Sequence, residues 1–110
     1  MFLKFDDTEK HTLAPDCKRS VLARTDNLLN CRLDMQKGHT APAHSHPHEQ
    51  ITYIISGKVE ITAGSEKEIL LSGDSVSFYP NMEHKYLALE DSVVLESFTP
   101  MRDDILNFKK

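Results

Sequence analysis

From residue 17 onward the chain is a series of short runs rich in apolar and β-branched residues, separated by turn residues. Such runs are typical of strands, because strand side chains alternate between two faces and β-branched and aromatic residues are favoured there. We expect about eight strands, over residues 18–25, 28–35, 51–55, 58–63, 66–71, 75–79, 84–89 and 92–98. Many short strands with brief connections predict an all-β fold, either a β-sandwich or a small barrel.

The length of 110 residues is enough for one domain. Residues 1–16 are irregular and polar, and we expect them to form an N-terminal arm or edge strand. Residues 17–110 are then expected to form a single domain. The only good helical candidate is the tail over residues 102–108, which follows Pro100.

Charge and hydropathy exclude several classes of protein. The 13 basic and 17 acidic residues are interspersed, and no basic block of the kind that binds nucleic acid is present. No run of about 18 apolar residues exists, so no membrane span is expected. The first residues are broken by charge and lack the apolar core of a signal peptide. Cys17 and Cys31 form no CxxC pattern, so we expect reduced thiols in a cytoplasmic protein, with a disulfide as the alternative.

Three of the six histidines lie in the seven-residue segment His44-Ser45-His46-Pro47-His48-Glu49-Gln50. Histidines at i and i+2 share a face on a strand but not on a helix. Because imidazole is the commonest metal-ligating side chain, this spacing predicts part of a metal site in a β-structure. A second segment begins at Gly73-Asp74 and reaches His84 eleven residues later. The residues between Gly57 and Gly73 are enough for a hairpin that returns the chain to the same pocket.

These two segments resemble the two motifs of the cupin superfamily. The first motif is matched at Gly38, His44, His46, Gln50 and Gly57, and the second at Gly73, Asp74 and His84. The resemblance covers roughly residues 20–100 and implies a small double-stranded β-barrel of the jelly-roll type. It also implies the metal ligands His44, His46, Gln50 and His84, with a hydrogen-bonding role behind the ligands as the alternative for Gln50. Imidazole ligands do not select one metal, so we expect one divalent transition metal such as Ni, Zn, Fe or Mn.

The chain departs from the cupin pattern at informative positions. Gln50 stands where many cupins have Glu, and strand parity predicts that Glu49 points away from the pocket. Asn81 stands where the family has Gly, and Asn tolerates left-handed backbone angles better than most residues. The other histidines, His11 and His39, are expected to be ordinary core or surface side chains. His48 is expected behind the ligands or at the surface, with a place near the substrate as the alternative.

The segment from Glu96 to Arg102 on its own is compatible with a last strand, with Phe98 in the core and Arg102 in a surface ion pair. Together with the histidine segment it resembles the KdgF-type cupins of pectin degradation. Those enzymes convert 4,5-unsaturated uronate monomers from pectin or alginate to linear keto-deoxyuronates. The resemblance implies catalytic roles for Glu96 and Arg102 and substrate contacts for Phe98 and Arg102. Tyr53 is a further candidate for the pocket wall.

The family acid is typically Asp, so Glu96 is a departure that affects the substrate expected more than the reaction. The expected partner is a small-molecule sugar acid, and the family analogy predicts a homodimer. Two alternatives stay open. One is another metal-dependent cupin enzyme, such as a sugar isomerase, lyase or dioxygenase, and the other is a non-catalytic cupin that binds a small acid.

Overall fold

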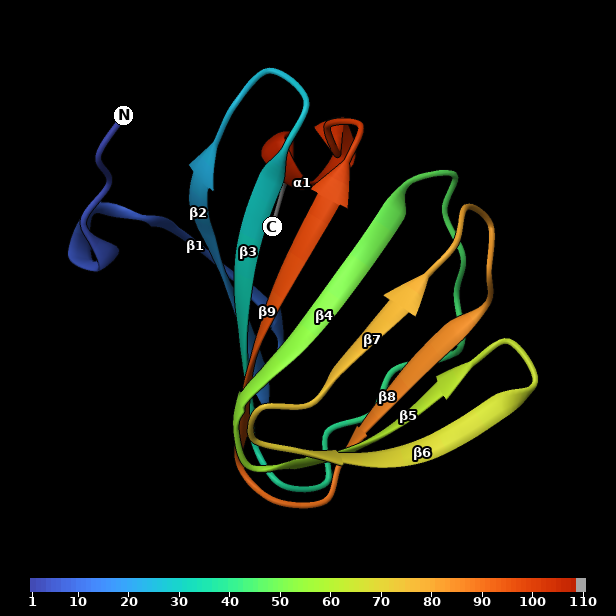
Figure 1. The fold of residues 1–110 in the computed structure, drawn as a ribbon. Coiled ribbons are helices and arrows are strands. Elements are labelled where there is room, and N and C mark those ends of the chain that lie inside the picture. Colours follow the sequence, from blue (N-terminus) through green and yellow to red (C-terminus); the bar gives the residue numbers. More distant parts are fainter. Residues whose placement is uncertain (109–110) are drawn as a thin grey trace.

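The computed structural model describes residues 1–108, which fold into two antiparallel sheets that face each other (Figure 1). The larger sheet has the strand order β1-β2-β3-β9-β4-β7, and the smaller has the order β6-β5-β8. The strands are β1 Glu9–Ala14, β2 Cys17–Arg24, β3 Leu29–Met35, β4 Glu49–Ser56, β5 Lys58–Ala63, β6 Glu66–Leu71, β7 Ser75–Phe78, β8 His84–Ala88 and β9 Ser92–Thr99. A 3-10 turn, η1 Phe5–Asp7, precedes them, and the helix α1 Asp103–Leu106 follows.

The predicted all-β fold with a short C-terminal helix is confirmed. Every expected strand is present, with ends that differ by at most two residues. The sheets do not close into a continuous barrel within the described residues, and two isolated bridges, Thr40 with Leu87 and His44 with His84, link segment 36–48 to β8. β1 pairs with β2 at the edge of the large sheet. No helix among residues 1–108 is long and apolar enough to span a membrane.

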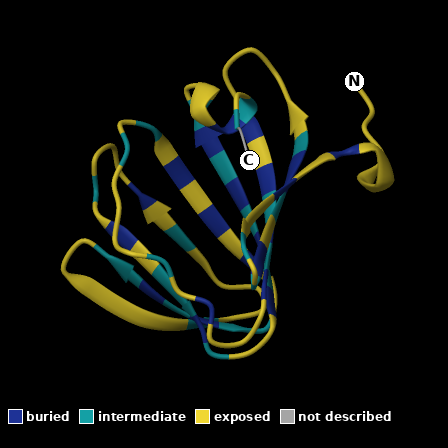
Figure 2. Cartoon of the chain, turned by 180° about the vertical axis from the view of Figure 1, so that it is seen from behind, coloured by how far each residue is buried: buried dark blue, intermediate teal, exposed yellow. Residues whose placement is uncertain are grey.

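Alternation along the strands places the core between the sheets, and Figure 2 shows buried and exposed residues alternating along the large sheet. In β9 the inward positions are Ser92, Val94, Glu96 and Phe98, so the same alternation that buries apolar residues also buries one carboxyl group. Cys17 and Cys31 are also buried, and both are free, as predicted. Burial raises the pKa of each thiol to about 12, which keeps it protonated and unreactive.

Gly57 makes the turn between β4 and β5 with φ +93°, and it lies against the turn before β9. A Cβ at Gly57 would overlap Ser92 Oγ and Asp91 O and lie 2.6 Å from Ser92 Cα. We therefore expect Gly57→Ala to lower the free energy of unfolding by about 3–5 kcal/mol, as measured by urea denaturation. Gly38 is the matched control, because its φ is +92° but a Cβ there meets nothing within 4 Å. Gly38→Ala should cost only about 1–2 kcal/mol, and equal costs for the two variants would contradict the packing argument.

Candidate active site and metal centre

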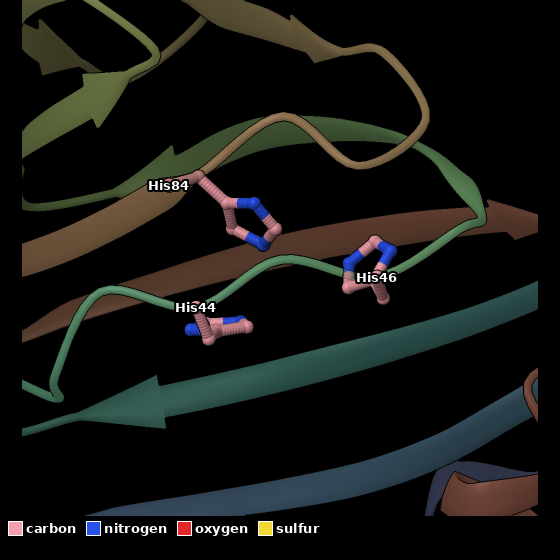
Figure 3. Close-up of side chains that lie close together, drawn as sticks. All are labelled: His44, His46 and His84. Atoms are coloured by element: carbon pink, nitrogen blue, oxygen red, sulfur yellow. The ribbon is translucent and has the colours of Figure 1, made fainter.

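Three histidines from two distant segments come together, and their candidate ligand nitrogens all lie within 4.8 Å of one another (Figure 3). Backbone pairing brings them there. His44 and His84 exchange N–H···O bonds of 3.1 and 2.9 Å, and the N–H of Asn81 donates to the carbonyl of His46 at 2.7 Å. Asn81 has a φ of 64°, the left-handed conformation expected where the family has Gly.

The expectation that the histidine pair lies on a strand is wrong. β4 does not begin until Glu49, and His44 forms only an isolated bridge while His46 lies in a loop. Pro42 and Pro47 have no backbone N–H, which prevents a continuous ladder through this segment. The extended loop still directs both imidazoles toward His84, so the spacing indicated the cluster although the element was different.

Each imidazole of the cluster uses Nδ1 in a backbone contact. The Nδ1 atoms of His44, His46 and His84 lie 3.4, 3.1 and 2.9 Å from the carbonyl oxygens of Pro42, His48 and Met82. A carbonyl can only accept a hydrogen bond, so Nδ1 carries the proton and Nε2 carries the lone pair. These contacts favour the tautomer that a metal ligand through Nε2 requires, most clearly for His84, whose contact is the shortest of the three.

The environment of the rings fits a divalent cation. The Nε2 of His84 is buried and has no hydrogen-bond partner among the described residues, a costly arrangement unless a ligand meets it. Burial lowers the pKa of His46 and brings that of His84 down to about 4, so both rings are neutral near pH 7. Three imidazoles are a donor set that suits divalent transition metals.

Gln50 lies beside this cluster, with its Oε1 2.9 Å from the Nε2 of His46. Its amide nitrogen lies within hydrogen-bond distance of three oxygens, Thr52 Oγ1 at 3.0 Å, Tyr86 OH at 3.0 Å and Glu96 Oε2 at 2.9 Å. The two protons of the amide are shared among these oxygens, which fixes the direction of the amide. Two acceptor atoms at this separation repel each other unless a cation lies beside both. The placement of the two atoms side by side therefore suits a cation that both would hold.

Glu96 is buried directly behind Gln50. Its Oε2 accepts hydrogen bonds from the amide of Gln50 and, at 2.8 Å, from the hydroxyl of Tyr86. Burial raises the pKa of the Glu96 carboxyl, against the lowering effect of the Tyr86 hydrogen bond and of nearby Arg102 and Arg19. A carboxyl group whose pKa moves toward neutrality is suited to proton transfer.

Tyr86 was not expected from the sequence. Its hydroxyl lies 2.6 Å from Thr52 Oγ1 and donates to Glu96, and burial followed by the repulsion of Glu96 raises its pKa well above the usual value. It therefore stays a neutral phenol. The signal that could have found it is parity, because Tyr86 follows His84 by two residues on β8 and so shares its face.

A cavity of about 140 Å³ joins these groups. Its wall includes His44, Gln50, Glu96, Phe98 and Arg102. The guanidinium of Arg102 lies 4.9 Å from the centre of the Phe98 ring, and its Nε donates to Asp104 at 2.8 Å. The structure thus brings the expected acid, aromatic and arginine residues to one cavity beside the histidine cluster.

The expected place of Tyr53 in the pocket wall is not supported. Gln50, Thr52 and Ile54 face inward along β4, so Tyr53 between them points to the outer face, and it is 44% exposed. The physical reason is the two-residue period of a strand, which also leaves Glu49 exposed, as expected from its parity.

His39 lies in the cavity wall, with its Nδ1 2.7 Å from Asp16 Oδ1, and His48 lies outside the cluster of three.

Comparison with known proteins agrees with this geometry. Residues 31–97 match the family model of the cupin domain. The chain is 33% identical over 103 residues to the pectin degradation protein KdgF of Dickeya dadantii (strain 3937), across 92% of this chain and 94% of that protein. The solved structure of KdgF from Halomonas sp. is 31% identical, with a TM-score of 0.89 over 96% of this chain and 99% of that chain. An RmlC-like cupin from Shewanella frigidimarina has the same fold, with a TM-score of 0.89 at 24% identity over 94% of both chains. The chain therefore belongs to the cupin family.

Proposed function

We propose that this protein is a metal-dependent enzyme that opens the ring of 4,5-unsaturated uronate monomers from pectin or alginate and yields linear keto-deoxyuronates. The observation that carries the proposal is a buried carboxyl, Glu96, that lines one cavity together with Arg102 and with His44 of the three-histidine cluster. The similarity to two KdgF proteins over nearly the whole chain supports the same reaction class.

The reaction is an isomerisation that moves one proton. In the cyclic substrate, the anomeric hydroxyl loses its proton, the bond between C1 and the ring oxygen breaks, and C1 becomes a carbonyl. The electron pair left on the ring oxygen is conjugated with the double bond between C4 and C5. Protonation at C4 then converts this enolate to a ketone at C5. No oxidant is needed, and the enzyme must remove a proton from oxygen and deliver one to carbon.

Glu96 is the group we assign to this proton transfer. Its carboxyl is buried and faces Gln50 and Tyr86, and burial raises its pKa, which favours a group that both takes up and releases a proton. Arg102 and Phe98 are assigned to substrate binding, since the guanidinium and the ring lie together in the cavity wall. The neutral hydroxyl of Tyr86 keeps the carboxyl in one orientation.

His44, His46, His84 and Gln50 are the residues that we propose hold the cation. A divalent cation supplies Lewis acidity that polarises the oxygen atoms of the substrate. The four donors are neutral groups, so they leave the full ionic charge available to the substrate. The choice among Ni, Zn, Fe and Mn remains a prediction, as do the homodimer, the cytoplasmic location and the single-domain assignment of residues 17–110.

An ultraviolet assay tests the proposal. Unsaturated galacturonate or guluronate monomers absorb through a double bond conjugated with the carboxylate, and ring opening removes this absorbance. We expect the metal-loaded protein to abolish the absorbance under anaerobic conditions, and the chelated protein to have no effect. A dioxygenase would require O₂. If neither substrate loses absorbance, the proposed reaction is wrong, and binding of a small acid without turnover becomes the better account.

A further inference from the structure

A second arginine, Arg19, lines the same cavity as Glu96 and Arg102. Arg19 lies on β2 between the buried Cys17 and Val21, so strand alternation directs it inward. It thus reaches the cavity from a strand distant in sequence from Arg102, which follows β9. The cavity wall therefore holds two arginines and one carboxyl group.

Arg19 is oriented by neutral groups. Its Nε and Nη2 lie 3.2 and 2.8 Å from the Nδ1 of His11, and its guanidinium carbon lies 5.3 Å from the centre of the Phe108 ring. His11 Nδ1 accepts these bonds, so that ring is neutral. Among residues 1–108, Arg19 forms no ion pair with a carboxylate. Its guanidinium is thus positioned without a direct carboxylate partner, although the charge of Glu96 acts on it from a distance.

Arg102 differs from Arg19 in its pairing. Its Nε and Nη2 both donate to the carboxylate of Asp104, which occupies one edge of the guanidinium and balances its charge. Burial lowers the pKa of Arg19, because withdrawal from water disfavours the charged form, and the nearby Glu96 carboxyl opposes this shift. An anionic ligand would supply the missing partner, and a planar carboxylate matches the fork of a guanidinium.

We propose that Arg19 binds the carboxylate of the sugar acid that enters this cavity. The identification of the ligand as a uronate rests on the proposed function. Arg19 then selects acidic sugars over neutral ones, and it places the uronate so that the reacting atoms face Glu96 and the histidine cluster.

Binding of a saturated uronate tests this role without turnover. We expect calorimetric titration of the metal-loaded protein to show that D-galacturonate binds more tightly than D-galactose. Arg19→Gln should weaken galacturonate binding by about 10- to 100-fold, since a charge-assisted pair is lost, and should leave the metal content unchanged. Arg19→Lys, which keeps the charge but not the fork, should give an intermediate loss. Arg32→Gln is the matched control, because Arg32 pairs with Asp34 and does not line the cavity.

The proposal would be overturned if Arg19→Gln bound galacturonate with an affinity within about twofold of the wild-type value. It would also be overturned if the wild-type protein did not bind galacturonate. If the variants do not fold, the Nε–H resonance of Arg19 in the wild-type protein should shift on addition of galacturonate but not of galactose, and an unmoved resonance would also overturn it. The two proposals can fail separately. If the wild-type protein turns over the unsaturated uronate but Arg19→Gln binds galacturonate as tightly as the wild-type protein, only the role of Arg19 is excluded. If Arg19→Gln binds galacturonate more weakly but the wild-type protein shows no turnover in the ultraviolet assay, only the reaction is excluded.

Discussion

Replacing Glu96 with glutamine is expected to lower kcat for ring opening by about 10²- to 10⁴-fold, the usual contribution of a positioned acid–base group. Glutamine has nearly the same shape, and its oxygen can still accept the hydrogen bonds that Tyr86 and Gln50 donate to Glu96. It cannot take up or release a proton at neutral pH. The ultraviolet assay measures the loss of rate, and metal analysis should show unchanged metal content, because no ligand has been altered.

Two further variants separate proton transfer from simple loss of structure. Glu49→Gln is the matched control, because Glu49 precedes Gln50 and is exposed on the other face of β4, and its turnover should be unchanged. Glu96→Asp keeps the carboxyl and restores the typical family residue, so it should retain more activity than Glu96→Gln, although the shorter side chain moves the acid by about 1 Å. Turnover of Glu96→Gln close to that of the wild-type protein would remove Glu96 from the mechanism.

The strands could be predicted from the sequence because their signals are local. Val59 and Ile61 alternate with polar residues in β5, and Gly57 and Gly73 mark turns that only a positive φ allows. The histidine cluster was also accessible, since the residue types and spacing of two motifs indicated it. The strand assigned to His44 and His46 was wrong, because the flanking prolines disrupt pairing and two isolated bridging bonds replace the ladder.

The parts of the site that the sequence did not indicate depend on contacts between distant strands. Tyr86 meets Glu96 because β8 and β9 lie in different sheets that face each other across the cavity. Arg19 has no local feature that distinguishes it from the exposed Lys18 beside it. Tyr53 shows the opposite error, because its parity with respect to Gln50 already placed it on the outer face. The sequence thus indicated the metal donors better than the groups that surround the substrate.

Replacing His44 with alanine is expected to abolish metal-dependent turnover and most of the stability that the metal provides. His44 is the most exposed of the three clustered histidines, so its truncation leaves no internal void, whereas His84 is buried and stacks on Phe78 with ring centres 4.5 Å apart. Residues that only orient a ligand through a hydrogen bond contribute up to about 100-fold to metal affinity. Loss of a ligand itself should therefore weaken metal binding by at least about 100-fold. At a metal concentration of about 1,000 times the wild-type Kd, the stabilisation of the folded state would then fall from about 4 to about 1.4 kcal/mol.

Thermal unfolding with added metal and after chelation measures this difference, and metal analysis of the purified protein gives an independent value. His48→Ala is the matched control. His48 belongs to the same motif, but it lies outside the cluster. Alanine keeps the His48 carbonyl that contacts His46 and removes only an edge-on ring contact with His46, at 5.5 Å between ring centres, and no candidate ligand. Metal affinity of His48→Ala should therefore stay close to that of the wild-type protein. If His44→Ala retains the metal and its stabilisation while His48→Ala loses both, the assignment of His44 as a ligand is wrong, and His48 holds the cation in its place.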